Sequence, residues 1–81
     1  MPKPRSNNGA KNLISANLME LRKQHQLSQR DLAHRLQLAG YDIDKNVITR
    51  IETNKRYVTD IEIKALCEIF DTTFEDLTKN A

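Results

Sequence analysis

The stretch LSQRDLAHRLQLAGYDIDKNVITRIE, residues 27–52, decides the fold of this chain of 81 residues. It contains two short runs with helical spacing of apolar residues, separated by a turn at residues 40–44. Ser28 is a good N-cap for the first run, with Asp31 as a shortened form of the capping-box acid, and Asp44 is the cap candidate for the second. We therefore predict a helix over residues 29–39, ended by a left-handed Gly40, and another helix from residue 45 to about Thr53.

The two predicted helices have distinct inner and outer faces. The inward residues are Leu32, Ala33 and Leu36 in the first helix and Val47, Ile48 and Ile51 in the second. Two short helices that cross at a steep angle need a small side chain at the crossing, and Ala33 is placed to be that residue. The outward residues of the second helix are Lys45, Asn46, Thr49, Arg50 and Thr53. Such side chains reach base edges, with Lys or Arg suited to guanine, Asn to adenine and the Thr methyl to thymine.

The rest of the chain predicts three further helices. Ile14, Leu18, Leu21 and His25 share one face of a helix over residues 12–25. A capping box opens a helix near residue 60, and the Thr73 and Asp76 pair opens a short last helix. The inward residues of the first of these two helices are Ile63, Leu66, Cys67 and Phe70, and the short last helix carries Phe74 and Leu77. We predict an all-α fold of five short helices at residues 12–81, preceded by a mobile basic arm at residues 1–11.

Charge is distributed unevenly along the chain. The formal net charge is only +2, but residues 1–35 carry seven Lys or Arg and two acids, whereas residues 61–81 carry two Lys and five acids. One end is therefore suited to anions. The basic arm either is a disordered start or wraps DNA. With two Tyr, two Phe and no Trp, the chain has few rings for stacking on unpaired bases.

The sequence also argues against several other functions. A chain this short buries only about 60% of its unfolded surface, which argues against a deep catalytic pocket, and we predict no enzyme activity. His25, predicted to fill the core, His34, predicted on the surface, and the inward Cys67 lack metal-ligand spacing, so we expect no metal and no cofactor. No segment is long and apolar enough to span a bilayer, no signal-peptide core follows the basic start, and one cysteine suits a reducing compartment, so we expect a cytoplasmic protein.

The order and spacing of four motifs resemble a known family. The motifs are LSQxxLA at the start of the helix predicted over residues 29–39, IxRIE at the end of the helix predicted from residue 45, the basic loop after it and the final FEDL. Together they are similar to the phage-repressor and Cro type, or XRE type, of helix-turn-helix domain. The resemblance covers about residues 12–78. This chain departs from the family where Gln37, Asn54 and Gln26 replace frequent glycines. The interval from Ala33 to Ile48 is also about five residues longer than in the shortest members.

The resemblance implies roles for particular residues. Base contacts would come from Lys45, Asn46, Thr49 and Arg50. Phosphate contacts would come from Ser28, Gln29, Asn54, Lys55, Arg56 and Tyr57. The positive end of the helix predicted over residues 29–39 independently favours an anion at Gln29. Arg22 would pair with Glu52 and so connect the helix predicted over residues 12–25 to the helix predicted from residue 45.

Two functions follow as hypotheses from the sequence. The first is a sequence-specific regulator of transcription that binds double-stranded DNA, expected to be a repressor that binds two half-sites as a homodimer. Its candidate dimer interface is the less basic C-terminal face around Ile69, Phe74 and Leu77. The second is a protein-interaction module of the antitoxin or anti-repressor type, which would use the same helices mainly to bind a partner protein.

Overall fold

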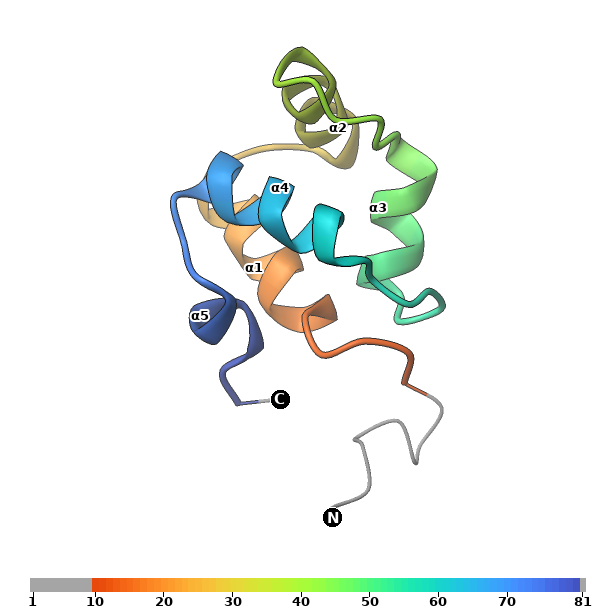
Figure 1. Ribbon diagram of the computed structural model, residues 1–81, viewed down its shortest axis with the longest axis vertical. Coiled ribbons are helices and arrows are strands. Elements are labelled where there is room, and N and C mark those ends of the chain that lie inside the picture. The colour runs from red at the N-terminus through yellow and green to blue at the C-terminus, as the bar shows by residue number, and fades with distance from the viewer. Residues whose placement is uncertain (1–9, 81) are drawn as a thin grey trace.

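The computed structural model describes residues 10–80 and shows five helices (Figure 1). They are α1 (Ser15–Gln24), α2 (Gln29–Leu38), α3 (Lys45–Glu52), α4 (Asp60–Phe70) and α5 (Phe74–Thr78). All regular secondary structure in the described part of the chain is helical, so the predicted all-α class is confirmed. The helices α2 and α3 lie next to each other, and α1 contacts both α3 and α5.

Side-chain caps set the beginnings of four helices. Ser28 and Thr59 each form a complete capping box with the acid three residues later, Asp31 and Glu62. The Asp44 carboxylate accepts the N–H of Val47 at 3.0 Å, and the Thr73 hydroxyl accepts the N–H of Asp76 at 3.1 Å. These local hydrogen bonds explain why α2 and α3 begin where the sequence predicts, and the positive φ of Gly40, 98°, follows the end of α2.

One apolar cluster joins all five helices. Its fully buried large side chains are Ile14, Leu18, Leu32, Leu36, Ile48, Ile51, Leu66 and Leu77. Ala33 is 4% exposed, as expected for the small residue where α2 meets α3, and Ile43 fills the core from the connection between these helices. The longer connection is thus tied to the core, and it places α3 against α1 and α2.

One predicted core residue, His25, is on the surface. His25 follows the last turn of α1, where its Nδ1 lies 2.9 Å from the carbonyl of Leu21 and its ring lies edge-on to Phe70. It is exposed because α1 ends one residue earlier than predicted. Phe74 is 54% exposed because it is the first residue of α5, whereas Leu77 on the same helix is fully buried. Leu77 therefore cannot belong to a dimer surface of the folded protein.

Two asparagines join the segment before α1 to the loop after α3. Asn54, at a φ of 62°, accepts the backbone N–H groups of Lys11 and Asn12 at 2.8 and 2.9 Å. In return, the Asn12 amide donates to the carbonyl groups of Ile51 and Arg56 at 3.2 and 3.0 Å. Figure 1 shows the segment before α1 running beneath this loop. The reciprocal bonds fix the loop and position the start of the described chain beside the end of α3.

The turn between α1 and α2 contains a strained residue that glycine should relieve. Gln26 is exposed and has a φ of 58°, a conformation that costs an ordinary residue roughly 1 kcal/mol or more. We expect Gln26→Gly to raise the free energy of unfolding by about 1 kcal/mol, measured by urea denaturation. Gln24→Gly, in the last turn of α1, is the control and should lower it by a similar amount. An unchanged or lower midpoint for Gln26→Gly would contradict the prediction.

Candidate nucleic-acid interface

Three polar residues of α3 form an exposed face opposite the buried one. Ile48 and Ile51 face the core at 0% and 1% exposure. Lys45, Asn46 and Arg50 are exposed, and none of their side chains makes a hydrogen bond or ion pair within residues 10–80. A short helix held by its inner face, with a cation at each end of the outer face, has the form that enters a major groove.

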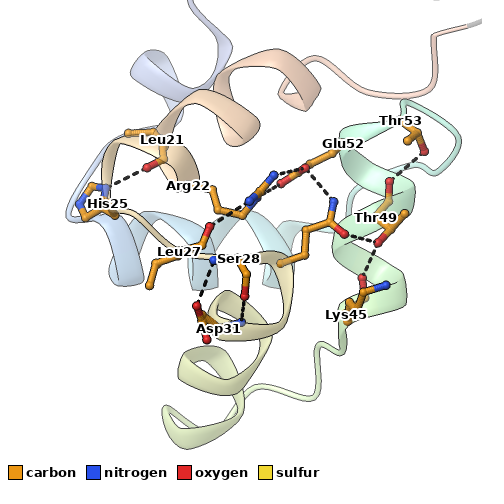
Figure 2. Close-up of polar contacts among 11 residues, drawn as sticks. Leu21, Arg22, His25, Leu27, Ser28, Asp31, Lys45, Thr49, Glu52 and Thr53 are labelled. Carbon is orange, nitrogen blue, oxygen red and sulfur yellow. Dashed lines mark hydrogen bonds and ion pairs between the residues drawn. The ribbon is translucent and has the colours of Figure 1, made fainter.

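Thr49 differs from the other three predicted base-contacting residues. It is half-buried, and its hydroxyl donates toward the side-chain carbonyl of Gln29 at 2.7 Å and toward the carbonyl of Lys45 at 3.0 Å. Figure 2 shows the dashed contact from Thr49 to Lys45, one turn earlier on the same helix. Because the hydroxyl proton is engaged inside the protein, the methyl group and the hydroxyl oxygen, as an acceptor, are what Thr49 could offer to a base.

A buried carboxylate joins α1, α2 and α3. Arg22 donates to Glu52 through Nε at 2.6 Å and through Nη2 at 3.0 Å, and its Nη1 donates to the carbonyl of Leu27 at 2.9 Å (Figure 2). The Gln29 amide donates to the same carboxylate at 2.9 Å. The structure therefore brings Arg22 and Glu52 together, in side chains exposed by only 12% and 1%. The hydrogen bond to Glu52 raises the pKa of Arg22 despite its burial, so the Arg22 guanidinium stays charged.

Capping hydrogen bonds engage two backbone N–H groups at the beginning of α2. The Ser28 hydroxyl accepts the N–H of Asp31 at 2.9 Å, and the Asp31 carboxylate accepts the N–H of Ser28 at 3.1 Å. These bonds lower the pKa of Asp31, so its negative charge persists at the positive end of the helix. The backbone N–H groups of Ser28 and Asp31 are thus in use, while the Ser28 hydroxyl keeps its own proton as a donor. Gln29 likewise keeps a second amide proton beyond the one given to Glu52.

The loop after α3 separates into exposed and engaged residues. Lys55 is exposed, and Tyr57 is 68% exposed with the Lys11 ammonium 5.1 Å from its ring centre. By contrast, Asn54 is used in the contact with residues 11 and 12, and Arg56 pairs with Glu62, a residue of α4 that is 8% exposed. The structure therefore presents Lys55 and Tyr57 to solvent, and it turns the Arg56 guanidinium toward α4.

Sequence reasoning missed three contributors to this surface. Asn12 holds the loop through contacts more than 38 residues away, and Glu62 is both a capping residue and the partner of Arg56. The third is Arg30, exposed in the first turn of α2. Arg30 had a local signal as a cation beside the predicted phosphate site, and Glu62 had one as the acid of the predicted capping box. The contacts of Asn12 are long-range, and the Arg56–Glu62 pair requires the loop to turn back onto α4, which spacing along the chain does not reveal.

The fold and this surface together define a helix-turn-helix domain, in which α2 supports the exposed face of α3. The profile of the helix-turn-helix family matches residues 18–77, and the chain belongs to this family, which is one of DNA-binding regulators. Searches of curated proteins and of solved structures found no match. In residues 10–80 no helix could cross a membrane, and no group of three potential ligands could hold a metal ion.

Proposed function

We propose that the protein is a sequence-specific repressor of transcription that binds double-stranded DNA as a homodimer in the cytoplasm. The observation that carries the proposal is the exposed face of α3, where Lys45, Asn46 and Arg50 are engaged with no other side chain of the described chain. Arg or Lys can donate hydrogen bonds to guanine, and the Asn side chain can both donate a hydrogen bond to adenine and accept one from it. A face with three such residues on a rigidly held helix is suited to reading base edges.

The neighbouring surface supports the same proposal because it offers groups for the DNA backbone. Lys55 and Tyr57 lie just beyond α3, and Gln29 lies at the start of α2. The backbone N–H of Lys11 donates to Asn54 in the same loop, and the Lys11 ammonium lies over the Tyr57 ring. Contacts with phosphate position the protein, while α3 supplies specificity. The protein would repress by occupying DNA that polymerase needs.

A domain of this size contacts few base pairs, so useful affinity requires two copies. The two copies would bind half-sites one helical turn, about 34 Å, apart. The site residues assigned in this proposal are Lys45, Asn46 and Arg50 for bases, with the methyl group of Thr49 beside them. Gln29, Lys55 and Tyr57 are assigned to phosphates.

Selection of bound duplexes from a randomised pool tests the proposal. Wild-type protein at moderate salt should enrich one sequence with two related halves whose centres are about 10 base pairs apart. Its affinity for that sequence should fall linearly in log salt, with a slope of about −0.9 for each phosphate contacted. Absence of any enriched sequence would contradict the proposal, whereas an enriched site without symmetry would contradict only the dimer.

A further inference from the structure

The side chain of Asn54 holds the segment that precedes α1. Asn54 lies two residues beyond α3 and has a φ of 62°, in the region that favours glycine. Its Oδ1 accepts the backbone N–H groups of Lys11 and Asn12 at 2.8 and 2.9 Å. A glycine would form the same turn with less strain, but it could not accept these two hydrogen bonds. The Asn54 side chain therefore joins the start of the described chain to the end of the helix proposed to read DNA.

Asn12 makes the same connection from the other side. Its amide Nδ2 donates to the carbonyl groups of Ile51, in the last turn of α3, and of Arg56, in the loop that follows, at 3.2 and 3.0 Å. We call the reciprocal hydrogen bonds of Asn12 and Asn54 the Asn12–Asn54 junction. Because Lys11 directly precedes Asn12 and gives its own N–H to Asn54, the junction fixes the backbone of Lys11.

Lys11 presents a cation beside the loop after α3. Its side chain is exposed, and its ammonium lies 5.1 Å from the centre of the Tyr57 ring. No carboxylate within residues 10–80 pairs with it. An ammonium over a ring still has N–H groups that can donate to an oxygen on the solvent side. Lys11 therefore adds a cation to the loop that carries Lys55 and Tyr57, which are both assigned to phosphates.

We infer that Lys11 binds a phosphate of the DNA backbone and that Asn54 positions Lys11 for this contact. This inference rests on the proposed function and adds to it one phosphate contact and one positioning residue. Of the cations in the predicted basic arm, Lys11 is the one within residues 10–80. Because the Asn12–Asn54 junction fixes its backbone when the protein folds, the segment loses less conformational freedom when DNA binds.

The first test measures Kd for the selected duplex and for an unrelated duplex between about 50 and 200 mM salt. Lys11→Ala should weaken binding to both duplexes and reduce the magnitude of the salt slope by about 0.9. The fall in affinity over this range of salt then becomes about 3.5-fold smaller. Lys79→Ala is the matched control and should leave the slope almost unchanged. Lys79 is also an exposed cation, but it follows α5, which packs on α1 and α4.

Asn54→Gly tests the positioning role separately, because glycine keeps the left-handed turn and removes the acceptor for the two N–H groups. Alone, it should lower the affinity and the salt slope by no more than Lys11→Ala does. Combined with Lys11→Ala, it should cause no further change, because the two residues act through one contact. A residue that acted only through the stability of the fold would have the same effect in both backgrounds.

Each outcome supports or overturns the inference. If wild type selects a sequence but Lys11→Ala keeps its salt slope, or if Lys79→Ala lowers the slope equally, Lys11 contacts no phosphate and the inference alone is wrong. If Asn54→Gly acts equally with and without Lys11, Asn54 does not position it. If wild type prefers no sequence, the proposed function fails and the inference fails with it. Should Asn54→Gly not fold by circular dichroism, Asn12→Ala, which removes the other half of the junction, takes its place.

Discussion

Arg22→Met is expected to lower the free energy of unfolding by about 3–5 kcal/mol, because it leaves the Glu52 carboxylate buried without its cation. The Glu52 side chain is only 1% exposed, and two of its hydrogen bonds come from Arg22 at 2.6 and 3.0 Å. After the substitution, the Gln29 amide would be the remaining side-chain donor to that carboxylate within residues 10–80. The midpoint of urea denaturation measures the effect.

Two further variants test whether the loss of stability comes from the burial of the ion pair and from the charge of Glu52. Lys64→Met removes the cation of the Lys64–Glu68 pair, whose side chains are 68% and 51% exposed, and it should leave the midpoint almost unchanged. Glu52→Gln keeps the shape and the contact with Gln29 but removes the buried charge. It should disturb the placement of α3 and lower DNA affinity without changing a base contact. An unchanged midpoint for Arg22→Met would mean that the buried pair contributes little to folding.

Local patterns in the sequence were sufficient for the beginnings of four helices, whereas α1, which has no side-chain cap, begins at Ser15, three residues later than predicted. Ser28, Asp44, Thr59 and Thr73 cap the helices that follow them, and each cap is a contact with a residue three positions later. The apolar spacing also identified Ile48, Ile51 and Leu66 as core residues. It was wrong for His25, because this residue lies just beyond the end of α1, where a shift of one residue changes the side that a side chain faces.

The site depended more on contacts that are distant in the sequence. The family resemblance suggested that Arg22 and Glu52 meet, 30 residues apart, and the structure shows the contact. Nothing in the local sequence indicated that Thr49 bonds to Gln29 or that Arg56 turns toward Glu62. Each of these bonds requires the relative placement of two helices, or of a loop and a helix. A residue type can therefore indicate a possible DNA contact while the fold uses its polar atoms internally.

Arg50→Ala and Asn46→Ala are each expected to weaken binding to the selected sequence by about 1–3 kcal/mol, or roughly fivefold to more than a hundredfold in Kd. Both side chains are exposed on α3 and have no side-chain partner within residues 10–80, so their removal leaves the fold intact. Binding to unrelated duplex should change less, because base-edge contacts contribute mainly to specific binding. The measurement is fluorescence anisotropy with both duplexes at a fixed salt concentration.

Lys55→Ala is the matched control for these two variants, because it removes an exposed cation in the loop beyond α3. It should weaken binding to both duplexes by the same factor and reduce the magnitude of the salt slope by about 1, as expected for a phosphate contact. Arg50→Ala and Asn46→Ala should also relax the sequence preference, each at different base pairs. If all three variants instead lowered specific and nonspecific affinity equally, α3 would contact only the DNA backbone, and sequence reading would have to come from another part of the surface.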